Sequence, residues 1–186
     1  MGDGVRLERR YDLAYLAIER PSARNALTPA VAEALVDACR ALAEDRDVRA
    51  VLVRGGDDFC VGLDPDESLD PLSDLDPAAA LAALPMPTIA AIRGACHGAG
   101  LALALACDLR FAARDATFAL PDLVQGGFPT LGSSQRLPRV VGRAKALELM
   151  LTGEPIDAAE AYRIGLVGQV VEPDVLDATA LTATRN

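Results

Sequence analysis

The chain has 186 residues, which is enough for one domain with a packed core and short for two. Hydrophobic residues make up 51% and charged residues 24% of the sequence, so a globular chain is expected and a disordered one is excluded. The net charge of −9 creates a field that repels polyanions. We therefore expect no nucleic-acid partner and no anionic membrane surface as partner, and a ligand with phosphate groups would need a local basic pocket.

The N-terminus and the apolar segments predict a cytoplasmic protein. The first ten residues carry charges where a signal peptide needs an apolar segment. The most apolar uncharged stretch, residues 94–107, has 14 residues, which is too short to cross a bilayer.

The metal-binding and redox-active residue types are sparse. Four cysteines lie in or beside apolar segments without CxxC spacing, so we predict reduced thiols in or near the core. His97 is the single histidine, and the carboxylates show neither an HExxH nor an EF-hand pattern. We expect no metal and no separate cofactor.

The first third of the chain predicts a parallel crossover unit. Residues 5–9 and 13–18 are typical of two short strands in a hairpin. Thr28 followed by Pro29 then predicts the start of a helix, because they suit the N-cap and the first helical position before a helical apolar pattern. The valine-rich residues 48–53 predict a buried strand after that helix. Strand, helix and strand in this order favour a parallel arrangement.

The remaining chain continues the α/β alternation. Residues 64–77 are acidic and proline-bearing, which predicts a solvated loop. Strands are predicted at residues 87–92, 109–113 and 166–171, and helices at residues 98–106, 135–141, 143–151 and 158–164. The glycine- and proline-rich residues 126–134 predict a turn. The fold class is therefore layered α/β, and residues 1–186 form a single predicted domain.

Two glycine-bearing turns are candidates for ligand binding. One is residues 59–64 (FCVGLD) and the other is residues 94–100 (GACHGAG). Glycine lets the backbone approach a ligand closely, and the first N–H groups of a helix have no partner within it. Such groups suit a phosphate or an oxyanion, although small residues also permit tight packing of a helix on a strand. Neither turn fits the GxGxxG or GxxxxGK[ST] nucleotide patterns.

Several segments taken together resemble the enoyl-CoA hydratase/isomerase (crotonase) family, in the same order along the chain. They are residues 20–27 (RPSARNAL), 59–64, 92–108, 118–137 (FALPDLVQGGFPTLGSSQRL), 151–153 and 158–171. The resemblance implies a spiral of strand-strand-helix units, assembled as a homotrimer or as a hexamer of two trimers. The family's C-terminal helical segment is missing or shortened in this sequence.

The resemblance also implies how an acyl thioester is held. In the family, two backbone N–H groups bind the thioester carbonyl oxygen, and the matching positions are Leu63 and Ala99. One such donor is worth about 3 to 4 kcal/mol of transition-state stabilisation. The implied substrate-binding positions are Ser22, Arg24, Ala26, Gly62, Asp64, His97, Gly98, Ala102 and Pro121. Arg24 is a candidate for a phosphate contact or for a plain salt bridge, and coenzyme A enters only as part of the acyl substrate.

The acid/base residues depart from the family's hydratases. A hydratase uses two glutamates, and the matching positions are Ala102 and Asp122. Alanine transfers no proton, so Asp122 remains as the one candidate acid/base, with a role in capping the following turn as the alternative. One carboxylate beside a stabilised enolate suffices to move a proton along an allylic system, as in the family's Δ3,Δ2-enoyl-CoA isomerases.

Three functions follow from this departure. The first is an acyl-thioester isomerase or lyase that uses Asp122. The second is a hydratase in which a fixed water or another group replaces the missing glutamate. The third is a non-catalytic subunit that keeps the fold and binds a partner. The acidic loop after Leu63 offers no cation to a nucleotide phosphate, so the acyl group is expected on coenzyme A or on another thioester carrier.

Overall fold

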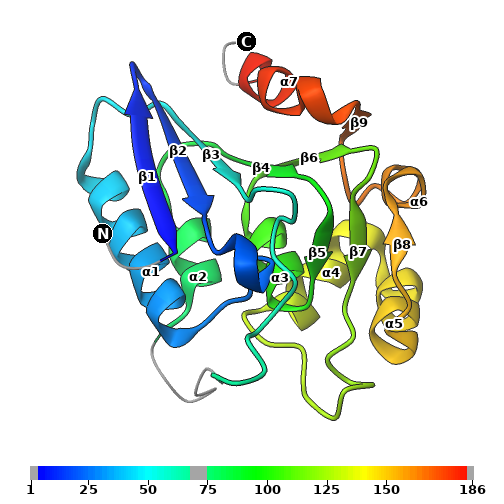
Figure 1. Ribbon diagram of the computed structural model, residues 1–186. Coiled ribbons are helices and arrows are strands. Elements are labelled where there is room, and N and C mark those ends of the chain that lie inside the picture. Colours follow the sequence, from blue (N-terminus) through cyan, green and yellow to red (C-terminus); the bar gives the residue numbers. More distant parts are fainter. Residues whose placement is uncertain (1–3, 68–74, 184–186) are drawn as a thin grey trace.

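The computed structural model describes residues 4–67 and 75–183, which form two β-sheets packed against helices (Figure 1). The strands are β1 (Val5–Arg10), β2 (Leu13–Ile18), β3 (Ala50–Arg54), β4 (Thr88–Ile92), β5 (Ala95–His97), β6 (Leu109–Ala113), β7 (Thr117–Ala119), β8 (Ile156–Asp157) and β9 (Gln169–Val171). The α-helices are α1 (Pro29–Glu44), α2 (Pro77–Ala82), α3 (Ala99–Ala106), α4 (Ser133–Val141), α5 (Arg143–Thr152), α6 (Ala158–Arg163) and α7 (Leu176–Thr182). Two short 3-10 helices are η1 (Pro21–Ala23) and η2 (Pro173–Val175).

The larger sheet has the strand order β1-β2-β3-β4-β6-β9. β1 and β2 form the predicted antiparallel hairpin, and every later pair in this sheet is parallel. α1 begins where the sequence predicts, because the Thr28 hydroxyl accepts a hydrogen bond from the Val31 N–H at 3.2 Å and Pro29 is the first helical residue. The predicted strand-helix-strand crossover is therefore confirmed.

The two faces of the larger sheet belong to different apolar clusters. Val51 and Val53 pack with α1, α2 and α3, whereas Leu52, between them, packs with α7. The alternation follows from the two-residue period of a strand. Figure 1 shows α7 lying across the sheet on the side away from α1 and α3.

α3 lies at the centre of the molecule, and all eight of its residues are buried. It follows β5, the first strand of the smaller sheet, whose order is β5-β7-β8. β5 pairs in parallel with β7, so the end of β5 and the start of α3 lie beside the loop that leaves β7. This junction positions the candidate site.

Most predicted elements are confirmed, with shifts of a few residues at their ends. The final strand is shorter than predicted, because residues 166–168 precede β9 and Leu166 and Val167 pack in the core as a turn.

The predicted acidic loop contains residues 68–74, which lie outside the described residues. The end of this predicted loop overlaps the start of α2, a helix that was not predicted. The Asp76 carboxylate caps α2 by accepting a hydrogen bond from the Ala79 N–H at 2.8 Å. β5, β7 and β8 were missed because two or three residues show no period.

The four cysteines are free and buried, as predicted. Within the described residues, no helix has the length and apolar character needed to cross a membrane.

Candidate active site

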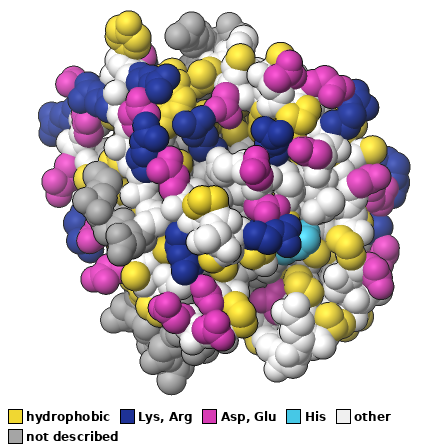
Figure 2. Space-filling model, in the orientation of Figure 1, with side chains coloured by type: hydrophobic (Ala, Val, Ile, Leu, Met, Phe, Trp, Pro, Cys, Tyr) yellow, Lys and Arg dark blue, Asp and Glu magenta, His cyan; other side chains and the backbone are white. Residues whose placement is uncertain are grey.

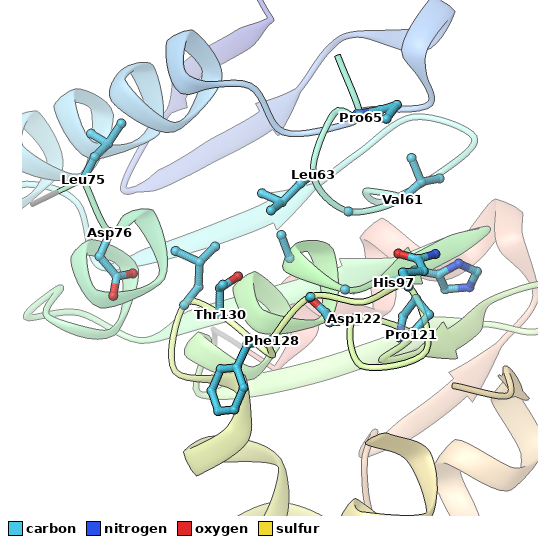
Figure 3. Close-up of a pocket in the computed structure, with 16 residues that line it drawn as sticks. Val61, Leu63, Pro65, Leu75, Asp76, His97, Pro121, Asp122, Phe128 and Thr130 are labelled. Atoms are coloured by element: carbon cyan, nitrogen blue, oxygen red, sulfur yellow. The ribbon is translucent and has the colours of Figure 1, made fainter. Parts of the chain in front are cut away.

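A cavity of about 1300 Å³ lies between the two glycine-bearing turns and the loop that follows β7 (Figure 3). Its lining is mainly apolar, with few groups able to titrate. The lining residues are Val61, Gly62, Leu63, Pro65, Leu75, Asp76, His97, Gly98, Ala99, Pro121, Asp122, Gln125, Gly127, Phe128, Thr130 and Leu131. The cavity therefore brings together both glycine turns and Asp122, as the resemblance implies.

The first turn presents the Leu63 N–H to the cavity. The Leu27 N–H donates to the Gly62 carbonyl at 2.8 Å, and the Asp64 N–H donates to the Leu27 carbonyl at 2.9 Å. In this parallel pairing the Gly62 carbonyl and the Asp64 N–H both face Leu27. The Leu63 N–H, which lies between them, therefore points to the opposite side. The φ angle of Gly62 is +118°, a conformation that side-chain-bearing residues rarely adopt.

The second turn presents the Ala99 N–H at the start of α3. The Gly98 N–H donates to the Ala119 carbonyl at 3.0 Å, and the Gly98 carbonyl accepts from the Ala102 N–H at 3.0 Å. Ala99 is the first helical residue, so its N–H has no partner within the helix. The φ angle of +50° at Gly98 again favours glycine.

The two turns are in contact. A Cβ placed on Gly62 would lie 4.0 Å from the Ala99 nitrogen, and one placed on Gly98 would lie 3.7 Å from the Gly62 Cα. In the described part of the chain, neither the Leu63 N–H nor the Ala99 N–H donates a hydrogen bond. Two backbone donors without a partner among the described residues therefore belong to residues that line the same cavity.

Asp122 faces these donors from the loop after β7. A Cβ on Gly98 would lie 3.6 Å from Asp122 Oδ2, and this oxygen is buried with no hydrogen-bond partner among the described residues. Burial raises the pKa of the Asp122 carboxyl, and a hydrogen bond from its own backbone N–H partly offsets the rise. The Asp122 carbonyl accepts from the Gly127 N–H at 2.8 Å, which closes the loop and fixes the backbone that carries the carboxylate.

Thr130 lies on the same wall and was not singled out by the sequence analysis. Its Oγ1 is buried and has no hydrogen-bond partner among the described residues. Figure 3 shows the Thr130 and Asp122 side chains on the side of the cavity opposite Leu63. Residues 126–134 were interpreted as a turn within the family-like segment 118–137, and no signal in the sequence distinguished Thr130 there.

Five of the implied substrate-binding residues do not line the cavity: Ser22, Arg24, Ala26, Asp64 and Ala102. Ser22 is exposed in η1, and Ala26 and Ala102 are buried in the protein. The Ala102 side chain, at the position of the missing glutamate, is fully buried within α3.

Two basic residues near the cavity, Arg20 and Arg24, are paired with carboxylates. Arg24 donates to both carboxylate oxygens of Asp58, at 2.7 and 3.0 Å, which is the plain salt bridge that the sequence left as an alternative. The Arg24 hydrogen bonds lower the pKa of Asp58, which also accepts from the Ala95 N–H at 2.8 Å. Arg20 pairs with Asp64 at 3.2 Å. Figure 2 shows basic and acidic side chains interspersed over this face, without a continuous basic patch for a phosphate.

His97 contributes backbone to the cavity, and its ring has a partner elsewhere. Its Nε2 lies 3.0 Å from Thr117 Oγ1, and in Figure 3 the ring lies on the side away from Asp122. Burial lowers the pKa of His97, so the neutral ring is favoured. Among the described residues, no cluster of three or more His, Cys, Asp or Glu side chains is placed to hold a metal ion.

Known proteins with similar sequences match most of this chain. A family model described as enoyl-CoA hydratase/isomerase matches residues 8–186. A protein named probable enoyl-CoA hydratase from Mycobacterium bovis is 40% identical over 190 residues, covering 97% of this chain and 74% of the relative. An (E)-benzylidenesuccinyl-CoA hydratase from Thauera aromatica is 38% identical over 182 residues, covering 92% of this chain and 71% of the relative.

Solved structures confirm the expected fold. An enoyl-CoA hydratase subunit I from Geobacillus kaustophilus aligns with a TM-score of 0.92 at 30% identity, covering 98% of this chain and 74% of that chain. An enoyl-CoA hydratase from Mycobacterium avium aligns with a TM-score of 0.91 at 38% identity, covering 98% and 80%. By sequence and by structure, the chain belongs to the enoyl-CoA hydratase/isomerase (crotonase) family.

Proposed function

We propose that this member of the family is an acyl-thioester isomerase or lyase in which Asp122 is the single acid/base. The Leu63 and Ala99 N–H groups bind the thioester carbonyl oxygen and stabilise the negative charge that develops on it. Since α3 begins at Ala99, the positive end of its dipole adds to the field at that oxygen.

The isomerase reaction needs only one carboxylate. Ionised Asp122 takes a proton from C2 of a 3-enoyl thioester, which gives a dienolate whose oxygen is held by the two N–H groups. The same carboxyl group then returns a proton to C4, so the double bond moves to C2–C3 and no atom is gained or lost. The raised pKa of Asp122 suits both halves of this transfer, because a base with a pKa nearer the working pH is more effective.

One observation carries the proposal. Asp122 Oδ2 is buried without a partner among the described residues and lies 3.6 Å from the position of a Cβ on Gly98, which adjoins Ala99, one of the two proposed N–H donors. A buried carboxylate oxygen left without a partner destabilises the fold, so its position is better explained by a substrate than by packing. Capping of the following turn is disfavoured as the role of Oδ2, because this oxygen has no hydrogen-bond partner among the described residues.

The test is turnover of matched 2-enoyl and 3-enoyl thioesters of coenzyme A. The proposal expects conversion of 3-enoyl to 2-enoyl substrates by the wild-type protein and loss of it in Asp122→Asn. Water addition to the 2-enoyl substrates without double-bond movement would contradict it. The absence of both activities, together with retained binding of a partner protein, would favour the non-catalytic subunit.

A hydratase is the second candidate, and the names of the relatives favour it. The proteins from Mycobacterium bovis and Thauera aromatica are both named as hydratases. With Ala102 buried and unable to transfer protons, this activity requires another group to hold the attacking water. Incorporation of oxygen from ¹⁸O-labelled water into the product separates hydration from isomerisation.

The carrier and the assembly are further parts of the proposal. Coenzyme A is the expected carrier from the family, whereas Arg20 and Arg24 are paired with Asp64 and Asp58, which does not favour a contact with its phosphates. Comparing the KM of coenzyme A thioesters with that of truncated pantetheine thioesters measures what the nucleotide contributes. A homotrimer or hexamer remains the expected assembly, and sedimentation analysis tests it.

A further inference from the structure

The cavity contains a second polar group that the proposed reaction does not use. Asp122 Oδ2 and Thr130 Oγ1 are the two buried side-chain oxygen atoms without a hydrogen-bond partner in the described part of the chain, and both belong to residues that line this cavity. Proton transfer by Asp122 leaves the Thr130 hydroxyl unexplained. A buried polar group is normally paired, so its partner is expected to come from the ligand.

Hydrogen bonds to backbone carbonyls hold the chain segment that carries the Thr130 hydroxyl. The Thr130 carbonyl accepts hydrogen bonds from the Ser133 N–H at 3.0 Å and from the Ser133 hydroxyl at 2.7 Å. The Leu131 carbonyl accepts from the Arg136 guanidinium at 2.8 Å. Leu131 and Gly132 both have left-handed φ angles, +51° and +73°, which make the turn before α4 sharp. The backbone that carries the hydroxyl is thus held in place before any ligand binds.

The surroundings of Thr130 make the hydroxyl selective. The apolar side chains of Leu131, Phe128 and Leu75 line the same cavity. A hydrocarbon acyl chain packed there would leave the hydroxyl unpaired, as it is in the free protein, whereas a chain with an oxygen atom at the right carbon would gain a hydrogen bond with it. Sites of this kind discriminate against analogues that lack the polar group.

We propose that Thr130 is a specificity-determining residue and that the cavity prefers acyl thioesters whose chain carries an oxygen substituent, a hydroxyl or a carbonyl, over plain hydrocarbon chains. The inference rests on the proposed function insofar as it takes this cavity as the acyl site. It requires no turnover, because the preference arises in binding. A retained water molecule is the alternative partner for the hydroxyl, and it would give no preference between chains.

The experiment measures binding of saturated coenzyme A thioesters by calorimetry. Two pairs differ by a hydroxyl in place of a methyl group: 3-hydroxybutanoyl against 3-methylbutanoyl, and 4-hydroxybutanoyl against pentanoyl. In the wild-type protein we expect the hydroxylated member of at least one pair to bind roughly 5- to 100-fold more tightly than its partner, the range set by leaving a hydroxyl unpaired. In Thr130→Val, which removes the hydroxyl at nearly constant shape, this preference should disappear. In Thr130→Ser, which keeps the hydroxyl, it should persist.

Stability and activity provide two controls. Thr130→Val should unfold at the same or a higher urea concentration than wild type, because it removes an unpaired buried hydroxyl; a large destabilisation would mean that the hydroxyl has a structural partner and would overturn the inference. Equal binding within both pairs, or a preference unchanged in Thr130→Val, would also overturn it. If every thioester fails to turn over while the preference is present and depends on Thr130, the proposed reaction is wrong and the specificity stands.

Discussion

The two walls of the cavity are built differently. The wall formed by the two glycine turns offers backbone N–H groups, and the hydrogen bonds that the neighbouring residues make with Leu27 and with the Ala119 carbonyl fix their direction. The opposite wall offers side chains, Asp122 and Thr130, whose reactive oxygens have no partner among the described residues. We therefore expect activity to survive side-chain changes in the first wall and to fall when one of its N–H groups is removed. In the second wall, we expect the change of a single side-chain atom to reduce activity or selectivity.

The strongest test of this difference is Asp122→Asn. The amide keeps the shape but accepts no proton, so we expect kcat for the isomerisation to fall by about 10²- to 10⁴-fold. The KM should change little, because the two N–H groups are unaffected. Steady-state kinetics with a 3-enoyl thioester provide the measurement. Asp37→Asn, an exposed carboxylate on α1, is the matched control and should behave as wild type.

The backbone wall is tested by Ala99→Pro. Proline is well tolerated at the first helical position, and here it removes the N–H that we assign to the carbonyl oxygen. We expect kcat to fall by about 10²- to 10³-fold while the circular dichroism spectrum is preserved. Leu63→Ala keeps its N–H and should change kcat by less than about threefold on the same grounds. Equal losses in the two variants would remove the distinction between the walls.

Asp58→Ala tests how much Asp58 contributes to stability through its contacts with the glycine turn that contains Ala95. Asp58 is largely buried, accepts from the Ala95 N–H and pairs with Arg24, so its loss should reduce the free energy of unfolding by about 1 to 3 kcal/mol. Arg24→Ala removes an exposed partner, and we expect less than about 1 kcal/mol. Urea denaturation measures both values. A KM for coenzyme A thioesters that rises more than about tenfold in Arg24→Ala would mean that Arg24 leaves Asp58 to bind a phosphate.

The smallest expected effect is the pH dependence of stability due to Asp122. Its pKa is raised in the folded state, so the folded protein binds this proton more tightly than the unfolded chain does. Its stabilising contribution is complete below the unfolded pKa and is lost as pH rises through the folded pKa. Asp122→Asn should therefore gain stability relative to wild type as pH rises from 4 to 7, measured by urea denaturation at each pH. A constant difference across this range would contradict the burial of the ionised carboxyl.

The sequence predicted the elements that have a clear period or cap. Thr28 and Pro29 set the start of α1, and the alternating apolar residues set β1 and β2, because these signals are local. β5 and β7 are too short to carry a period, and their pairing depends on contacts between residues far apart in the chain. A glycine turn therefore predicts a possible close approach but not which other turn it meets.

The candidate site was predictable only in part, because sequence motifs identify single residues but not the contacts between distant segments. Leu63, Ala99 and Asp122 were found through the family's motifs, and the structure brings all three to one cavity. Arg24 and Asp64 were expected at the substrate, yet their charges are taken up by Asp58 and Arg20. Ion pairing between distant loops cannot be read from residue spacing. Thr130 was missed because an unpaired hydroxyl is a property of the folded cavity and has no signature in the sequence.

The most direct test of the account is the carbonyl stretching frequency of a bound acyl thioester labelled with ¹³C at the carbonyl carbon. Two N–H donors on one oxygen polarise the C=O bond, so the account predicts a clear shift to lower frequency on binding and a smaller shift in Ala99→Pro. A bound thioester whose carbonyl frequency equals that in water, or is unaffected by Ala99→Pro, would contradict the claim that the Leu63 and Ala99 amides hold the same oxygen.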